Sequence, residues 1–280
     1  MFAPSDVELQ QTGAAASARQ AVSRRNRWIA AAPLVVIATA GWVVVRYLTQ
    51  RPGDAPAQDD QAPAAARPLG GDGDVIDLPP LDQSDAIVAK LVHALSSHPT
   101  VTAWLATDGL IRNFVVVVEN VAYGTRPAVH LQVIRPAARF RTIERDGELL
   151  LDPRSYERYT PIAAAAGSID PDAAARLYST LKVRIEEAYV ELGRNESFDV
   201  ALERALVSLL QTPSLSGDVR LEPTGIVFGY ENPAVEQLTP AQKQLIRMGP
   251  VNMRLIQTKL HQIALALGIP PARLPQARSL

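Results

Sequence analysis

The longest apolar run in the chain covers residues 28–45 and reads WIAAAPLVVIATAGWVVV, without a charged side chain. Eighteen helical residues at about 1.5 Å each span roughly 27 Å, close to the ~30 Å hydrocarbon core of a bilayer. The pattern therefore predicts a transmembrane signal-anchor helix over residues 24–48. Two alternatives stay open: a signal peptide cleaved after residues 38–40 (ATA), and a buried core helix, in which Pro33 and Gly41 would be awkward.

Basic residues flank the predicted helix unequally. Four arginines precede it or lie at its start, and two follow the apolar run: Arg19, Arg24, Arg25 and Arg27, then Arg46 and Arg51. Because cationic side chains resist transfer across the membrane, this excess predicts a cytoplasmic amino terminus. The remainder of the chain would then lie in the periplasm of a bacterium, behind a single-pass anchor in the inner membrane.

Three segments lack the apolar periodicity of a folded element. Residues 49–77 consist mainly of Pro, Ala, Gly and Asp, and they contain too few large apolar side chains to offset the entropy of ordering. We interpret them as a flexible linker. Residues 1–23 and 269–280 are predicted to be a disordered cytoplasmic amino terminus and a disordered tail. The intervening residues 78–268 form the predicted periplasmic domain, as one unit or two.

Apolar residues at steps of three and four predict helices within this domain. The clearest patterns begin at a capping residue: after Asp82 or Ser84, after Asp170-Pro171, after Ser197 and after Thr239-Pro240. The last of these is interrupted at Gly249-Pro250 and ends at Gly268. Residues 110–121 also keep a helical period, although their FVVVV run is compatible with a strand. A further short helix is predicted at DPRSYERY, residues 152–159.

Short alternating stretches predict two β-hairpins. RFRTI and ELLL flank the turn-forming pair Asp146-Gly147, and DVRLE is followed by GIVFGY. The predicted fold class is therefore α+β: a mostly helical globular domain with one or two small β-hairpins, preceded by a single transmembrane helix and a disordered linker.

Composition excludes some functions. The 280 residues contain no Cys and carry a net charge of −1. The absence of Cys removes disulfides, thiol catalysis and Cys-ligated zinc. Residues 78–280 carry 21 basic and 21 acidic side chains, so no global positive field favours nucleic acid, and none is expected as a partner.

Three motifs occur in order along the domain: LPPLD at 78–82, LDPRSYERY at 151–159 and TPAQKQLIRMGPVNMRLIQTKL at 239–260. With these motifs the chain resembles domain-of-unknown-function family 3014, a group of single-pass bacterial envelope proteins found mostly in proteobacteria. The similarity covers about residues 78–268. It implies a membrane-anchored periplasmic domain, and it transfers no site residue, because the family has no assigned activity or ligand.

Motifs for catalysis, metal or cofactor binding are not evident. The four histidines, His93, His98, His130 and His261, do not have the spacing of zinc ligands, and no Gly-x-Ser-x-Gly elbow or phosphate-binding loop occurs. Glu186, Glu187 and Glu191 are interpreted as a solvated helix face, although two acids in a cleft could serve a glycosidase. We expect no cofactor and no metal. A membrane-tethered hydrolase with Ser/His or carboxylates assembled in space stays open as the alternative.

One stretch without an acidic residue is a candidate binding surface: Arg126, His130, Arg135, Arg139 and Arg141. Arg139 and Arg141 would project on the same side of a strand and could meet lipid headgroups or the carboxylates and phosphates of envelope polymers. The alternative is a solvated strand, balanced by the acids at 144, 146 and 148.

Two further groups are candidates for partner binding. Ile256, Leu260, Ile263 and Leu267 repeat at four, three and four, a seam for a partner helix or a second copy of the chain, or else ordinary core packing. Tyr156 and Tyr159 could stack on a sugar, or pack at a helix start. The sequence thus favours a non-enzymatic binding or scaffolding module that meets an envelope protein or an anionic envelope polymer.

Overall fold

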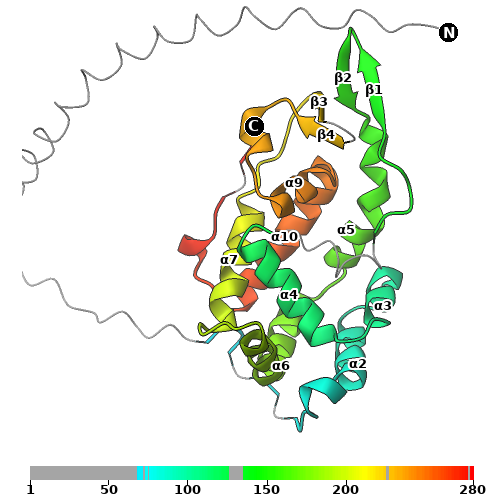
Figure 1. The fold of residues 1–280 in the computed structure, drawn as a ribbon. Coiled ribbons are helices and arrows are strands. Elements are labelled where there is room, and N and C mark those ends of the chain that lie inside the picture. Colours follow the sequence, from blue (N-terminus) through cyan, green and yellow to red (C-terminus); the bar gives the residue numbers. More distant parts are fainter. Residues whose placement is uncertain (1–67, 72, 75, 126–134, 225–226, 277) are drawn as a thin grey trace, which may run out of the picture. The chain divides into compact units, whose positions relative to one another are not determined.

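The computed structural model describes residues 68–71, 73–74, 76–125, 135–224, 227–276 and 278–280 (Figure 1). The predicted amino terminus, transmembrane helix and most of the predicted linker lie outside these residues. In the described part no single helix is both long and apolar enough to cross a bilayer. Only α3 (Pro99–Leu105) and α4 (Leu110–Ala122) pass that criterion together, and they are bent by 108°.

The described residues are mostly helical and contain two small antiparallel strand pairs, which confirms the predicted α+β class. The longer helices, besides α3 and α4, are α2 (Asp85–Leu95), α5 (Thr160–Gly167), α6 (Pro171–Glu191), α7 (Phe198–Leu210), α9 (Pro240–Ile246) and α10 (Pro250–Ala266). Short helical turns are η1 (Leu81–Gln83), η3 (Pro153–Ser155), η4 (Glu157–Tyr159), α8 (Pro233–Glu236) and η5 (Pro271–Arg273). The strands are β1 (Thr142–Arg145), β2 (Glu148–Leu151), β3 (Leu221–Thr224) and β4 (Val227–Tyr230).

Helix starts lie where the capping residues predict them. The Asp170 side chain accepts a hydrogen bond from the N–H of Ala173 at 2.7 Å, and Ser197 caps α7 by accepting from the N–H of Asp199 at 3.3 Å. Thr239 and Gln242 form a capping box at the start of α9. These caps satisfy backbone donors that a helix start leaves without an intrahelical partner.

Several short elements differ from the prediction. Residues 152–159 form two 3-10 turns, η3 and η4, and not a regular helix, because Pro153 and the Asp152 cap favour a tight turn. Helices α3, α5 and α8 were not predicted. They span seven, eight and four residues, which is too short for an apolar period to show in the sequence.

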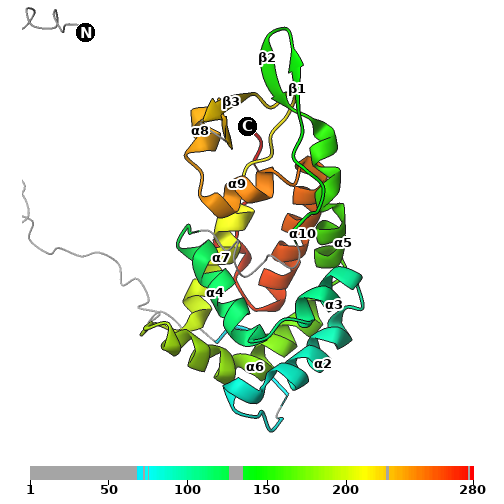
Figure 2. The ribbon, with the colours of Figure 1, turned by 45° about the vertical axis from the view of Figure 1, so that its right-hand side comes forward.

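The larger hydrophobic core lies between the long helices α2, α4, α6, α7 and α10. Helix α4 packs along α7, and α6 lies against both α4 and α10 (Figures 1 and 2). Phe198 is fully buried here, and the rings of Phe114, Tyr178 and Tyr189 surround it at 5.6, 6.4 and 5.2 Å between centroids. Such aromatic contacts add to the burial of apolar area, so Phe198 joins α4, α6 and α7.

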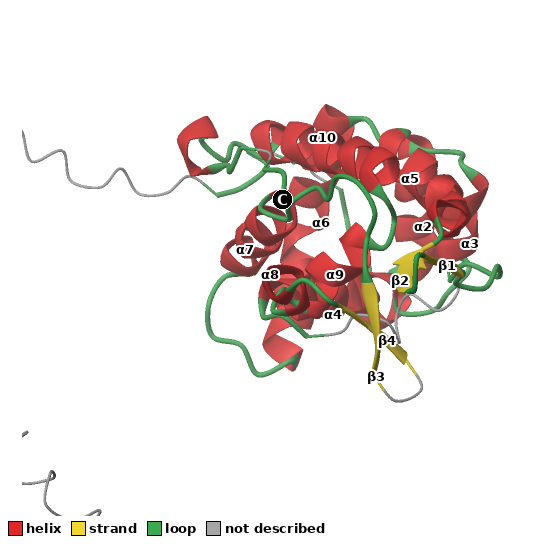
Figure 3. Ribbon diagram, turned by 90° about the horizontal axis from the view of Figure 1, so that it is seen from above, coloured by secondary structure: helices red, strands yellow, loops and turns green. Residues whose placement is uncertain are grey.

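A second, smaller core joins the two hairpins to α5, α8, α9 and the first half of α10. β1 pairs with β2 in the register Arg145↔Glu148 across the predicted Asp146-Gly147 turn, and β3 pairs with β4. The two hairpins lie side by side (Figure 3). A main-chain hydrogen bond joins them: the N–H of Leu151, in β2, donates to the carbonyl of Val219, just before β3, at 2.9 Å.

The folded unit extends beyond both predicted ends. At the amino side Leu69 is buried, although it was assigned to the flexible linker. At the carboxyl side Ile269 and Leu274 are buried, and the N–H of Ser214 donates to the carbonyl of Arg278 at 2.8 Å, although residues 269–280 were predicted to be a disordered tail. Both predictions are wrong for these residues. Single apolar side chains and main-chain hydrogen bonds hold these segments, and neither produces a periodic apolar pattern in the sequence.

Candidate functional site

The described part of the predicted basic stretch, residues 135–141, is not a strand. Arg126 and His130 lie outside the described residues, and Arg135, Arg139 and Arg141 are exposed in the segment that precedes β1. The prediction that Arg139 and Arg141 project from a strand is wrong. β1 begins at Thr142, opposite Leu151, and the chain beyond Leu151 turns away into η3, so residues 139–141 have no partner strand.

Arg141 is nevertheless held in place by the DPRS turn. The N–H of Arg141 donates to the hydroxyl oxygen of Ser155 at 2.8 Å, and that hydroxyl donates back to the carbonyl of Arg141 at 3.0 Å. The N–H of Asp152 donates to the same carbonyl at 3.1 Å. Ser155 and Asp152 are both buried. The backbone at Arg141 is therefore fixed, which lowers the entropic cost of binding a ligand there.

A single buried carboxylate holds two exposed guanidinium groups. The Asp152 side chain is 4% exposed, and it accepts from Arg154 Nη2 at 2.8 Å and from Arg141 Nε at 3.3 Å, whereas these arginines are 61% and 58% exposed. The side-chain hydrogen bond from Arg154 lowers the pKa of Asp152 to about 2. Asp152 is thus ionised at neutral pH, and the three groups together keep one positive charge.

Arg158 extends the positive surface. Its guanidinium lies over the rings of Phe140 and Tyr159, with 5.4 and 4.8 Å between the guanidinium carbon and the ring centroids. Arg158 Nη1 donates to the carbonyl of Ala138 at 3.4 Å. The Nε of Arg158 is buried and has no hydrogen-bond partner within the described residues. Arg158 therefore packs beneath residues 138–140 and keeps an unused donor.

We define the arginine surface as five residues: Arg135, Arg139, Arg141, Arg154 and Arg158. Among the residues that the structure describes, Arg135, Arg139 and Arg158 form no ion pair. In the hairpin next to them Arg145 pairs with Asp218 and Glu148 pairs with Arg220, both at 2.7 Å, whereas Glu144 and Asp146 form no ion pair with the described residues. Residues 135–158 carry six arginines and five acidic side chains, a net charge of +1, and the positive charge is concentrated on the arginine surface and not on the hairpin. Arg154 and Arg158 were not predicted as site residues, although the Asp-x-Arg spacing at 152–154 indicates an ion pair within one turn.

The two tyrosines do not form a sugar platform. Tyr159 is 6% exposed, and its hydroxyl accepts from Arg158 Nη2 at 3.2 Å and from Gln244 Nε2 at 3.0 Å. Tyr156 is half-buried, packs against the smaller core, and has its pKa raised by burial. The structure therefore favours the alternative in which both tyrosines pack at the turn that carries the arginine surface.

The predicted partner seam lies inside the chain. Ile256 is a buried member of the smaller core, Leu267 is buried in the larger core, and Leu260 and Ile263 pack against these cores. The seam is therefore the contact of α10 with its own domain. The structure favours the core-packing alternative.

Among the described residues, the histidines and serines do not form the Ser/His catalytic site that the hydrolase alternative requires. Ser96 and Ser168 share a hydrogen bond at 2.7 Å, and the N–H of His98 donates to Ser96 Oγ at 3.1 Å. However, His98 Nδ1 accepts from the N–H of Thr100 at 3.2 Å as the cap of α3. In a neutral imidazole the proton then lies on Nε2, so neither nitrogen is left to act as a base toward Ser96. His93 is exposed, and the described residues contain no group of three potential metal ligands.

The three acids of α6 each have a structural partner. Glu186 accepts from the N–H of Phe198 at 3.0 Å and so caps the start of α7, and Glu187 pairs with Arg184 at 2.6 Å. Glu191 accepts from Arg112 Nε at 2.6 Å and from Arg112 Nη2 at 2.9 Å. This pairing lowers the pKa of Glu191. Glu186 and Glu191 therefore join α6 to other helices, Glu187 pairs within α6, and the structure favours a structural role for all three acids.

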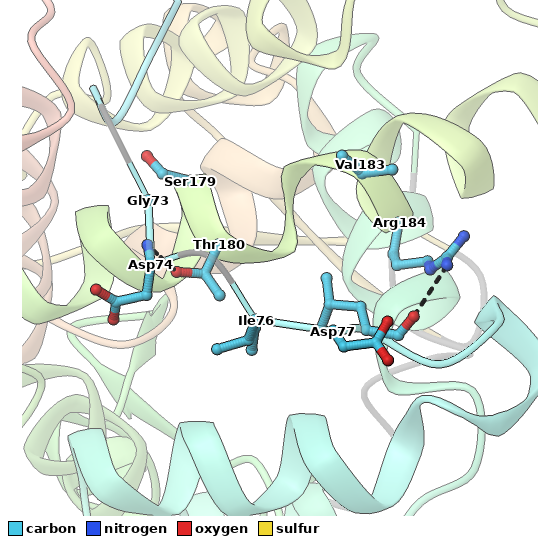
Figure 4. Close-up of a pocket in the computed structure, with 9 residues that line it drawn as sticks. Gly73, Asp74, Ile76, Asp77, Ser179, Thr180, Val183 and Arg184 are labelled. Carbon is cyan, nitrogen blue, oxygen red and sulfur yellow. Dashed lines mark hydrogen bonds between the residues drawn. The ribbon is translucent and has the colours of Figure 1, made fainter.

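Two shallow cavities lie elsewhere. One of about 370 Å³ is bounded by residues 73, 74 and 76–78 and by α6 at Ser179, Thr180, Val183 and Arg184 (Figure 4). The other, of about 360 Å³, lies beside the second hairpin at Arg220 and Tyr230. Neither is lined by a histidine, and neither contains a member of the arginine surface.

Comparison with known proteins gives one match. A family model described as a protein of unknown function (DUF3014) matches residues 110–264, more than half of the chain, and this range includes the arginine surface. No curated protein and no solved structure matches the chain.

Proposed function

The chain belongs to the protein-of-unknown-function family DUF3014, and we propose that its domain is a non-enzymatic binding module of the bacterial cell envelope. On this proposal residues 24–48 anchor the protein in the inner membrane by a single pass, with the amino terminus in the cytoplasm and the domain in the periplasm. The uncharged run at 28–45 and the arginine excess on its amino side support this placement.

The ligand we propose is an anionic envelope polymer, bound on the arginine surface. One observation carries the proposal: Arg141 and Arg154 converge on the single buried carboxylate of Asp152 and remain largely exposed. An arginine pair fixed in this way presents planar donors that match carboxylate and phosphate oxygens. Arg139 and Arg135, which have no ion pair with the described residues, supply the additional charge.

The geometry favours a chain of negative charges over a single small anion. Neither cavity is lined by a residue of the arginine surface, which runs along residues 135–158. An open surface excludes little water, so each exposed contact contributes only modestly and several contacts are needed. A polymer with repeated carboxylates or phosphates can make several such contacts at once. Anionic lipid headgroups have the same chemistry and are the competing outcome of the test.

The test compares two charge reversals in the full chain, reconstituted into nanodiscs of neutral lipid. The first variant is Arg135→Glu with Arg139→Glu, on the arginine surface. The matched control is Lys90→Glu with Arg176→Glu, two exposed residues of α2 and α6. Binding is measured by co-sedimentation with isolated cell-wall sacculi and, separately, with vesicles that contain phosphatidylglycerol.

We expect the first variant to bind sacculi at least about tenfold more weakly, a change of ~1.4 kcal/mol, and the control to bind as the unmodified chain does. Equal losses in both variants would mean that net charge alone governs binding, which contradicts the proposal. Binding to vesicles and not to sacculi would identify lipid headgroups as the ligand and overturn the choice of a polymer.

A further inference from the structure

The chain enters the domain through a short glycine-rich segment that lies against α6. We call residues 69–71 and 73–74 the clip. Leu69 is 8% exposed and belongs to the larger core, whereas the neighbouring Gly71 and Asp74 are exposed. The clip is thus joined to the core by one apolar side chain, and its remaining contacts are made by the main chain.

Three main-chain donors of the clip are satisfied by three different helices. The N–H of Leu69 donates to Asp199 Oδ2 of α7 at 3.1 Å, and the N–H of Gly70 donates to the carbonyl of Leu267, at the end of α10, at 2.9 Å. The N–H of Asp74 donates to Thr180 Oγ1 of α6 at 3.1 Å (Figure 4). The clip therefore bridges the middle of α6, the start of α7 and the end of α10.

Two glycines let the clip approach α6 more closely than other residues could. A Cβ on Gly70 would lie 2.2 Å from Ser179 Oγ, and a Cβ on Gly73 would lie 2.5 Å from the backbone nitrogen of Thr180. In contrast, a Cβ on Gly71 would meet no atom within 4 Å. The close contact with backbone atoms at Thr180 cannot be relieved by a side-chain rotation. Docking of the clip thus requires glycine at position 73.

The receiving carboxylate stays satisfied when the clip leaves. Asp199 also accepts from the hydroxyl of Tyr178 at 2.5 Å and from Lys182 Nζ at 2.6 Å. Because these two donors belong to α6 and Asp199 belongs to α7, the α6–α7 contact does not depend on the clip. Release removes one hydrogen bond at Asp199 and does not leave a buried charge without a partner.

We infer that the clip is a strap that undocks from α6 as a unit, under tension on the preceding chain, while the helical core stays folded. Tension applied before Pro68 reaches the clip first, because the clip is the point at which the chain joins the core. One buried leucine and three hydrogen bonds resist it, whereas the core behind it comprises five packed helices. Release uncovers the part of the larger core that Leu69 covers, and docking is restored when tension falls.

A pulling experiment on the full chain in detergent tests this device. The chain has no native cysteine, so Gln58→Cys and Gln262→Cys provide two unique attachment points, the second on the exposed side of α10. We expect a reversible early lengthening before cooperative unfolding. It cannot exceed about 45 Å, because the thirteen residues from Pro68 to Pro80 extend by at most about 3.5 Å each.

Gly73→Ala should remove the early lengthening or shift it to lower force. The matched control Gly71→Asn should leave it unchanged, because asparagine tolerates a positive φ and its side chain enters open space. Absence of an early step in the unmodified chain, or the same step in Gly73→Ala, would overturn the inference.

Hydrogen exchange provides a second measurement: the amides of residues 69, 70 and 74 should exchange together and faster than those of α6. Exchange of all three at the α6 rate would equally refute it.

Discussion

The ring of Tyr156 covers the Cα of Gly249. A Cβ on Gly249 would lie 2.3 Å from Cγ of Tyr156, and Gly249 has a φ of +84°. Asn252 completes the contact, since its Nδ2 donates to the carbonyl of Tyr156 at 3.0 Å and to that of Met248 at 2.9 Å. Two of the three motifs noted in the sequence, LDPRSYERY and the motif that contains MGPVN, therefore meet at Tyr156, which lies between Arg154 and Arg158 in the sequence.

Gly249→Ala should destabilise the domain strongly, because the new methyl group displaces the Tyr156 ring and the backbone adopts a region that only glycine favours. The matched control is Gly268→Ala, at a φ of +87° with no atom within 4 Å. We expect Gly249→Ala to lower the free energy of unfolding by at least about 2 kcal/mol more than the control does, measured by urea denaturation. Equal losses would mean that the Tyr156 contact does not matter.

Asp152→Asn should remove an acid-dependent part of the stability. The pKa of Asp152 is lowered to about 2 in the folded chain, below the value of an unfolded aspartate. Its contribution is therefore present above about pH 4 and is lost as the pH falls toward 2. We expect the unmodified domain to be more stable than Asp152→Asn at pH 7, and the difference to narrow through this window in urea titrations.

A difference between Asp152→Asn and the unmodified chain that stays constant from pH 5 to pH 2 would contradict the role of the carboxylate charge. Arg145→Gln provides a control, because its ion pair with Asp218 is exposed on both sides, with 55% and 58% of the side chains accessible. Such a pair contributes little, so this variant should follow the unmodified chain at each pH.

Glu119 joins α4 to the end of α6, and its truncation should be costly. Tyr189 is fully buried, and its hydroxyl donates to Glu119 Oε2 at 3.1 Å, while Arg194 forms an ion pair with the same carboxylate. We expect Glu119→Ala to lower the free energy of unfolding by about 1–3 kcal/mol, because it leaves a buried hydroxyl poorly bonded. Glu148→Ala, which removes an exposed ion pair with Arg220, should cost less than about 1 kcal/mol in the same urea series.

Tyr230 should make the domain sensitive to alkali. Burial raises its pKa to about 12 against the opposing effect of the nearby Arg247, and no hydrogen bond to its hydroxyl meets the geometric criteria among the described residues. An unfolded tyrosine ionises near pH 10, so stability present below pH 10 is lost as the pH rises toward 12. Tyr230→Phe should match the unmodified chain at pH 7 and lose less stability between pH 10 and pH 12. An identical alkaline loss in both chains would exclude Tyr230 as its source.

Local chemistry made much of the fold predictable. The caps at Asp170, Ser197 and Thr239 act within three residues of their own position, and the Asp146-Gly147 turn specifies the first hairpin by itself. Of the helices that begin at these caps, α6 and α7 are long enough to show an apolar period, whereas α9 has seven residues and was predicted from its Thr-Pro start. Such signals are contained in the sequence because the interactions that produce them are local.

The candidate site depends on contacts that the sequence does not display. Asp152 and Arg141 are eleven residues apart and meet only because the first hairpin folds back, and Arg158 reaches the carbonyl of Ala138 across twenty residues. The clip is likewise held by Asp199, which lies 130 residues from Leu69. In the sequence alone, the clip has the composition of a linker, and the arginines resemble scattered surface charges.

The salt dependence of binding tests the arginine surface most directly. The association constant of the full chain, in neutral-lipid nanodiscs, for isolated cell-wall sacculi is measured over a series of salt concentrations, for the unmodified chain and for Arg135→Gln with Arg139→Gln. Each cation that contacts a polyanion adds close to one unit to the slope of log association constant against log salt. We predict a slope that is smaller by about two in the double variant. Equal slopes, with or without a change in affinity, would contradict the claim that this surface binds the polymer.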